Sequence, residues 1–120
     1  MSVVFSLTAC TPAEEPYARA AGDAFQAALR SHHNDVACQL LSDEARGRLE
    51  SGSGKPCEEA IARLGLPVGG VRSLEVWGGN SQVRLDAGVL FLAQFKAGWK
   101  VTGAGCRPRP DQPYDCQVEG

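Results

Sequence analysis

The chain has 120 residues, of which 43% are hydrophobic and 22% charged, a composition typical of one globular domain rather than of a disordered segment. Its formal net charge is -2, and no block of like charge stands out, which argues against a surface that binds the phosphate backbone of a nucleic acid. No apolar run approaches the ~20 residues that a membrane-spanning helix needs.

The first fifteen residues have the features of an export and anchoring signal. A short apolar run ends in Leu7-Thr8-Ala9-Cys10, and small residues before a cysteine resemble a lipobox, the cleavage signal of bacterial lipoproteins. The run is short for the core of a secretory signal, so we expect the end of a longer signal peptide. Residues 1–15 are predicted to be a signal-peptide remnant, lipobox and tether, with acyl chains on Cys10 inserted in the membrane. The alternative is an N-terminal strand or helix extension with a free Cys10 thiol.

Residues 16–64 show the three- and four-residue spacing of amphipathic helices. The first helix is predicted to run from Pro16 to the "SHHND" segment. Its apolar stripe comprises Tyr17, Ala21, Ala24, Phe25, Ala28 and Leu29. A short helix follows in "DVACQLL", and Ser42 with the two acids after it signals the start of a third. Pro56 begins a fourth helix, which Gly65 ends.

The second half of the chain changes to the period of β-strands. "VRSLEVW" and "SQVRLD" alternate on either side of "GGN", which predicts a hairpin, and "VLFLAQF" and "WKVTGAG" follow after short glycine-containing turns. These segments predict a four-stranded antiparallel meander after about four helices, an α+β fold. The last stretch, "CRPRPDQPYDCQVEG", holds three prolines and is predicted to be an extended loop tied by a disulfide.

The chain has five cysteines and no C-x-x-C pair, which argues against a zinc site or a redox-active dithiol. Setting Cys10 apart, the other four allow three pairings. We favour Cys38–Cys57 and Cys106–Cys116, because each pair joins segments close in the chain and the second loop is rich in turn-forming residues. Disulfides persist in oxidising compartments, so they indicate an extracytoplasmic location. The alternative is buried free thiols in a cytosolic protein.

The segments "DVACQLLSDEARGRL", "PCEEAI", "VWGGNSQVRL" and "GWKVTGAGC" follow an "AF..AL" helix. In this order they resemble the small NTF2-like lipoproteins of high-GC Gram-positive bacteria, over about residues 16–106. The resemblance implies that the helices pack into the concave face of a curved sheet and form a cone. It also implies a single NTF2-like domain over residues 16–120, and with Cys10 it predicts anchoring to the outer face of the cell membrane.

Few residues carry recognisable chemistry. His32 and His33 are helix neighbours whose side chains point about 100° apart, so they are predicted to lie at a solvated helix end and to bind no metal. The ionisable residues that an enzyme of this fold could use are Asp23, Asp35, Arg72, Arg84 and Asp86. No nucleophile with a partnered base and no G-x-S-x-G motif accompanies them. Trp99 is expected in the core, whereas Trp77, beside a turn, is the better candidate for a surface contact.

Together these features predict a lipid-anchored extracytoplasmic domain that binds or scaffolds a partner, with no catalysis, cofactor or nucleic acid. The partner is expected at the sheet face or cone mouth and is either another protein or a second copy. One alternative is a small enzyme or small-molecule binder that uses the cone pocket. The other is a structural module that dimerises through the sheet face. The fold hosts all three kinds of function, so the sequence does not choose the ligand.

Overall fold

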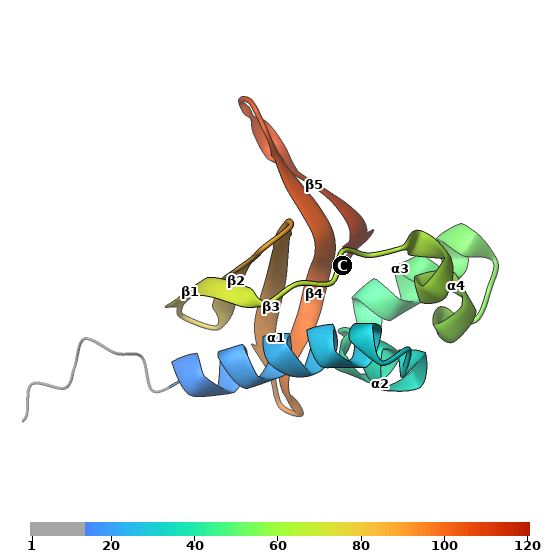
Figure 1. The fold of residues 1–120 in the computed structure, drawn as a ribbon, viewed down its shortest axis with the longest axis horizontal. Helices are drawn as coiled ribbons and strands as arrows, with labels where there is room; N and C mark the ends of the chain where they lie inside the picture. The colour runs from blue at the N-terminus through green and yellow to red at the C-terminus, as the bar shows by residue number, and fades with distance from the viewer. Residues whose placement is uncertain (1–13) are drawn as a thin grey trace, which may run out of the picture.

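The computed structural model describes residues 14–120, in which four helices precede one five-stranded sheet (Figure 1). The helices are α1 (Glu15–Arg30), α2 (Asn34–Leu40), α3 (Asp43–Ser53) and α4 (Cys57–Leu64). The strands are β1 (Val71–Trp77), β2 (Asn80–Leu85), β3 (Val89–Phe95), β4 (Gly98–Arg109) and β5 (Gln112–Glu119). The predicted lipobox and Cys10 lie outside the described residues.

The predicted α+β class is confirmed, with the helices first and the sheet second. Every strand pairs antiparallel with its neighbour in the chain, giving the order β1-β2-β3-β4-β5. Helix α1 lies across one face of this sheet, while α2, α3 and α4 gather beyond its β5 end (Figure 1). The enclosed cone that the resemblance implies stays a prediction.

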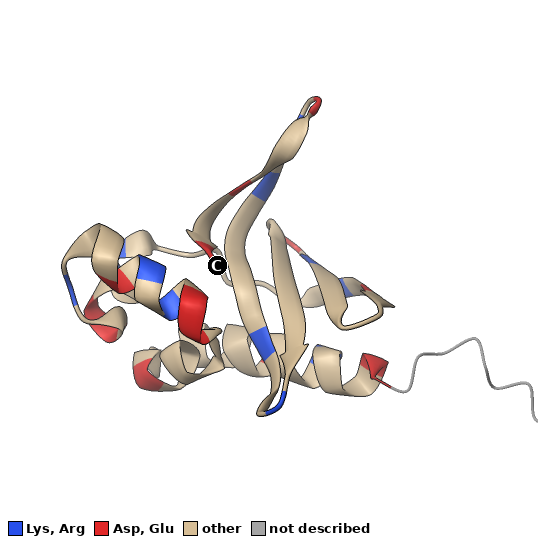
Figure 2. Ribbon diagram, turned by 180° about the vertical axis from the view of Figure 1, so that it is seen from behind, with Lys and Arg blue, Asp and Glu red and all other residues tan. Residues whose placement is uncertain are grey.

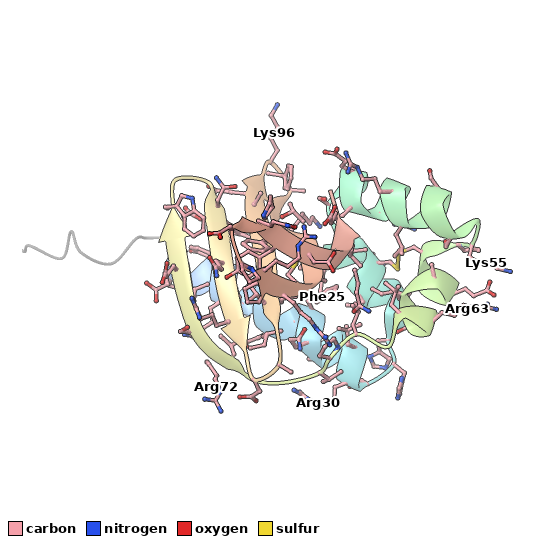
Figure 3. The ribbon with its side chains drawn as sticks, turned by 90° about the horizontal axis from the view of Figure 1, so that it is seen from above. Phe25, Arg30, Lys55, Arg63, Arg72 and Lys96 are labelled. Carbon is pink, nitrogen blue, oxygen red and sulfur yellow. A yellow bond between two sulfur atoms is a disulfide. The ribbon has the colours of Figure 1, made fainter. Side chains whose placement is uncertain are left out.

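Helix α1 packs on the sheet through small residues and one large ring. Ala18, Phe25 and Ala28 lie on its buried stripe, and Phe25 has no exposed surface. In Figure 3 Phe25 lies in the middle of the molecule, whereas Lys55, Arg63 and Lys96 point outward. The row of the sheet that faces the helices runs across four strands and contains Val76, Ser81, Leu92 and Val101. A continuous core therefore lies between α1 and one sheet face.

The boundary of α3 follows the capping signal in the sequence. Ser42 is the N-cap, and its Oγ accepts a hydrogen bond of 3.1 Å from the Ala45 N–H. At the other end Gly54 adopts a left-handed conformation with φ of 68°, where a residue with a side chain would be strained. Local chemistry alone accounts for both ends of this helix.

The predicted C-terminal loop and the predicted strand count are both wrong. Residues 98–119 form a long β4–β5 hairpin whose turn end extends away from the rest of the fold (Figure 1), so the sheet has five strands. The hairpin turns at Pro110-Asp111, where Asp111 has φ of 55°. Prolines exclude a helix but are tolerated in edge strands, at turns and at bulges, and this hairpin holds all three sites.

Two disulfides are present, and they are the links that the spacing favours. Cys38–Cys57 joins α2 to the start of α4, and Cys106–Cys116 joins β4 to β5. Cys106 and Cys116 are directly opposite in the ladder, so the second bond staples the base of the protruding hairpin. Each bond therefore links two elements that pack against each other in the fold.

Replacing Phe25 with alanine is expected to lower the free energy of unfolding by about 3–5 kcal/mol, because a fully buried ring is removed and a cavity remains. The matched control on the same helix is Tyr17→Ala, whose side chain is 65% exposed and whose loss should change stability by less than about 0.5 kcal/mol. Urea unfolding followed by circular dichroism measures both. Equal losses in the two variants would contradict the packing of α1.

Removing the Cys38–Cys57 bond with Cys38→Ala and Cys57→Ala together is expected to lower the free energy of unfolding by about 3 kcal/mol. The bond closes a segment with a sequence separation of 19, and a link of this length restricts the unfolded chain by about that amount. Thermal and urea unfolding of the oxidised proteins measure the difference. An unchanged midpoint and slope would show that this link does not constrain the unfolded chain.

Candidate binding face

The sheet face opposite α1 carries an aromatic surface, which we call the binding face and define by Trp77, Gln82, Phe91, Ala93, Phe95 and Tyr114. Strand register decides its membership, because successive side chains alternate between faces. Trp77 is opposite Asn80, which is opposite Ala93, and Gln82 is opposite Phe91. The row of Val76, Ser81 and Leu92 points toward α1 and lies between these two rows. The side chains of the two rows therefore point to the face of the sheet opposite α1.

The aromatic side chains of the binding face differ in exposure. Trp77 is 50% exposed and Phe95 is 48% exposed, the largest apolar surfaces on the sheet. Phe91 and Tyr114 are half-buried against each other, with ring centroids 5.1 Å apart in an edge-to-face arrangement. The Gln82 Nε2 donates to the Tyr114 Oη at 3.3 Å, which ties β5 to β2 across the face. A rigid pair is thus flanked by two exposed rings.

Two shallow hollows extend along this face. One, of about 430 Å³, is lined by Phe91, Gly103 and Tyr114 among others, and the second, of about 300 Å³, by Phe95 and Lys100 among others. Space beside Gly103 in the first hollow is tight, because a Cβ there would lie 3.3 Å from the Cys106 Sγ and 3.4 Å from the Phe91 ring. The face therefore offers apolar hollows rather than one enclosed pocket.

Charge does not single out any part of this surface. Lysine, arginine, aspartate and glutamate are interspersed along the helices and strands rather than gathered on one face (Figure 2). Within residues 14–120 no group of three or more His, Cys, Asp or Glu side chains is placed to hold a metal ion. The same residues include no helix long and apolar enough to cross a membrane.

Three of the ionisable candidates from the sequence and the two histidines lie apart from one another. Asp23 and Asp35 are exposed on α1 and α2, and Arg84 is exposed on β2. His32 and His33 are exposed in the turn between α1 and α2, where the sequence predicts a solvated helix end. Across the described residues no hydrogen bond or ion pair joins any two of these five side chains. They assemble no acid–base pair.

Asp86 and Arg72 do meet, at the exposed turn between β2 and β3. The Arg72 Nε is 2.6 Å from the Asp86 Oδ1, and the Gly70 N–H donates to Oδ2 at 3.0 Å. The Arg72 hydrogen bond, and after it the Gly70 hydrogen bond, holds the pKa of Asp86 below its ordinary value of 3.8. This pair connects β1 to the turn between β2 and β3, and neither residue lines the two hollows.

The two tryptophans lie as the sequence predicts. Trp99 is 6% exposed, and its Nε1 donates to the Glu14 Oε2 at 3.1 Å. Trp77 is on the binding face. Phe91 and Tyr114 are not predicted as site residues from the sequence, because residues 106–120 are predicted to be a loop and the sequence does not show which residue lies beside Phe91. Alternation of tyrosine, cysteine and valine at 114, 116 and 118 is the signal that favours a strand there.

No protein-family model, no curated protein and no solved structure matches the chain.

The pKa of Asp86 is expected to lie below its ordinary value, and Arg72→Ala is expected to raise it. Ionised Asp86 is favoured in the folded state, so its contribution to stability is present above the ordinary pKa and is lost as the pH falls through the lower folded-state value. A pH titration followed by NMR of the carboxyl carbon measures this. The matched control is Arg84→Ala, on the neighbouring strand, which should leave the pKa unchanged. A similar shift in both variants would rule out the direct contact.

Proposed function

We propose that the protein is a lipid-anchored extracytoplasmic domain that binds another protein through the binding face. The observation that carries the proposal is the pair of half-exposed rings, Trp77 and Phe95, on one side of the sheet. Large aromatic side chains are enriched where proteins bind one another, because they bury much apolar area with few rotatable bonds. Single exposed apolar residues are ordinary, but two beside apolar hollows on one face favour a contact surface.

The rigid centre of the face supports the same function. Phe91 and Tyr114 are held by their mutual contact and by the Gln82 hydrogen bond, and the hairpin below them is stapled by the second disulfide. A surface that is ordered before it binds loses less conformational entropy in the complex. The partner that this chemistry fits is a protein with an exposed apolar patch that fills the hollows beside Phe91 and Phe95.

The cysteines are the basis for the proposed membrane anchor and for the proposed location outside the cytoplasm. Two disulfides are compatible with an oxidising compartment outside the cytoplasm. Cys10 follows a lipobox-like sequence, and more than one acyl chain would hold the domain at the membrane firmly. In this arrangement Cys10 attaches the protein to the cell membrane, and the folded domain meets its partner at the outer surface.

Trp77→Ser and Phe95→Ser are expected to abolish retention of the partner from detergent-solubilised membranes of the natural host. Loss of a central aromatic contact typically costs about 2 kcal/mol or more of binding free energy. The matched controls are Tyr17→Ser and Val68→Ser, which remove exposed apolar side chains elsewhere. Quantitative mass spectrometry of the retained proteins makes the comparison. If all four variants retain the same proteins as the wild type, the binding face is not the contact surface.

A second copy on the binding face would instead favour the structural dimerisation module. Sedimentation velocity over a range of protein concentrations separates the two functions, because only self-association changes the mass. A dimer that Trp77→Ser dissociates and Val68→Ser leaves intact would replace the proposed partner with a second copy of this chain. If the protein stays monomeric at all concentrations, the proposed partner remains a different protein.

In its own host the full chain is expected to be processed so that Cys10 becomes the first residue and carries a diacylglyceryl group. Intact mass spectrometry of the membrane fraction measures both the lost residues and the added lipid. Cys10→Ser should move the protein from the membrane fraction to the soluble extracytoplasmic fraction. A wild-type protein with a free Cys10 thiol and no lipid would disprove the anchor. The binding face is tested separately, by the Trp77→Ser and Phe95→Ser variants.

A further inference from the structure

The two disulfides of the described chain differ in how deeply they are buried. Cys38 and Cys57 are each 1% exposed and belong to the hydrophobic core. Cys106 is fully buried as well, but its partner Cys116 is partly exposed. A thiolate must reach one sulfur of a disulfide to break the bond. Burial of both cysteines therefore protects the first bond, whereas the second is open to attack at Cys116.

The second bond lies beside the first hollow of the binding face. A Cβ on Gly103 would lie 3.3 Å from the Cys106 Sγ and 3.5 Å from the Cys116 Sγ. The same Cβ would lie 3.4 Å from the Phe91 ring, so both sulfurs and the ring surround one point of the hollow. Cys116 lines this hollow together with Tyr114. The disulfide is therefore part of the surface on which the binding face depends.

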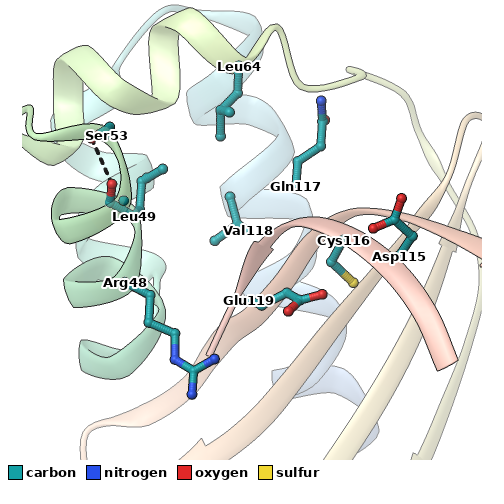
Figure 4. A pocket seen from close by; sticks show the side chains of 10 residues that line it. Arg48, Leu49, Ser53, Leu64, Asp115, Cys116, Gln117, Val118 and Glu119 are labelled. Carbon is teal, nitrogen blue, oxygen red and sulfur yellow. Dashed lines mark hydrogen bonds between the residues drawn. The ribbon is translucent and has the colours of Figure 1, made fainter.

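Cys116 also lines a second space, between β5 and the helices. A groove of about 520 Å³ runs there, with Leu49 and Leu64 on its helical side (Figure 4). Of the two bonded cysteines, only Cys116 lines the groove and the hollow. A thiol that enters either space therefore reaches Cys116 and not Cys106.

The bond holds the end of the hairpin that carries Tyr114. The bonded cysteines are directly opposite in the ladder, and the residues beyond them, 107–113, are all exposed. Tyr114 is held by its contact with the Phe91 ring and by the Gln82 hydrogen bond. A segment with so few buried groups opens more often once its covalent link is removed. Opening of the hairpin would separate Tyr114 from Phe91 and change the hollow.

We propose that Cys106–Cys116 is a thiol–disulfide exchange site that a dithiol reductant opens at Cys116, and that its redox state controls the binding face. One thiolate of the reductant attacks the Cys116 Sγ, so that a new S–S bond forms as the bond to Cys106 breaks. Cys106 leaves with the electron pair as a thiolate and takes a proton from water. The second thiolate of the reductant then attacks the reductant's own bonded sulfur, which releases Cys116 as a thiolate and leaves the reductant as a disulfide.

A dithiol suits this site better than a monothiol. Cys106 stays opposite Cys116 while the strands are paired, so its thiolate attacks the mixed disulfide and restores the original bond. A second thiol on the reductant competes with that return. As regulation of partner binding the inference rests on the proposed function, but the exchange site itself does not, and its measurements need no partner.

The first test exposes the oxidised full-length protein to dithiothreitol without denaturant. Thiols present beforehand, Cys10 included, are blocked with N-ethylmaleimide, and thiols formed later are labelled with iodoacetamide and quantified by peptide mass spectrometry. Cys106 and Cys116 are expected to be labelled at least about tenfold faster than Cys38 and Cys57, the matched control within the same chain.

Urea separates attack on the folded protein from attack on the unfolded chain. Concentrations below the unfolding transition should leave the reduction rate of Cys106–Cys116 unchanged within about twofold and should raise that of Cys38–Cys57, because only the buried bond requires unfolding. Equal rates for the two bonds, or a parallel rise of both with urea, would overturn the proposal.

The position of attack is measured with 2-mercaptoethanol and an early acid quench, which stops exchange. In the mixed disulfides, mercaptoethanol is expected on Cys116 at least about tenfold more often than on Cys106, because only Cys116 is accessible. Intact-peptide mass spectrometry at low pH measures the distribution. An even distribution, or attachment mainly to Cys106, contradicts attack from the hollow or the groove and overturns the proposal.

NMR spectra of the selectively reduced protein test the control of the binding face. Reduction is expected to move the Tyr114 ring signals and the Gln82 side-chain amide signals, because the edge-to-face contact of the Tyr114 ring loosens. The indole N–H signal of buried Trp99 should stay in place. Unchanged Tyr114 and Gln82 signals would overturn redox control of the face. Partner retention that Trp77→Ser abolishes would still support the proposed function in that case.

Discussion

Ser42 joins the helical half of the chain to the sheet, and the position of α3 beside β5 depends on it. Its N–H donates to the Val101 C=O at 2.9 Å, and its Oγ accepts from the Ala45 N–H at 3.1 Å. The residue is 3% exposed, so both bonds form away from water, where a lost partner costs about 1–3 kcal/mol. One residue therefore closes the lower edge of β4 and also starts α3. Because α3 starts there, it packs beside β5.

The same junction divides the outer edge of β4 between two partners. Leu41 forms a parallel bridge with Val101, and from Gly103 onward β5 takes over the pairing. The lower half of β4 is thus closed by the helical segment and the upper half by its own hairpin. Where the hairpin extends past α3, the Cys106–Cys116 bond holds its two strands together.

The two faces of the sheet carry different side chains, because successive residues of a strand point to opposite faces. One face contacts α1 and is filled by aliphatic side chains and Phe25. The other is covered by no helix of the described chain and carries the aromatic rings of the binding face. The uncovered face suits the protein-binding function that we propose.

The sequence by itself determined the four helices, the first four strands and the favoured disulfide links, because periodicity, capping residues and short loops are local signals. Ser42 starts α3 and Gly65 follows α4 where these signals predict. For the site it identified Trp77 alone, as an aromatic residue beside a turn. Tertiary structure decided the fifth strand and the Phe91–Tyr114 pair. Each needs hydrogen bonds or contacts between segments distant in the chain, and neither proline content nor periodicity specifies which strand edges meet.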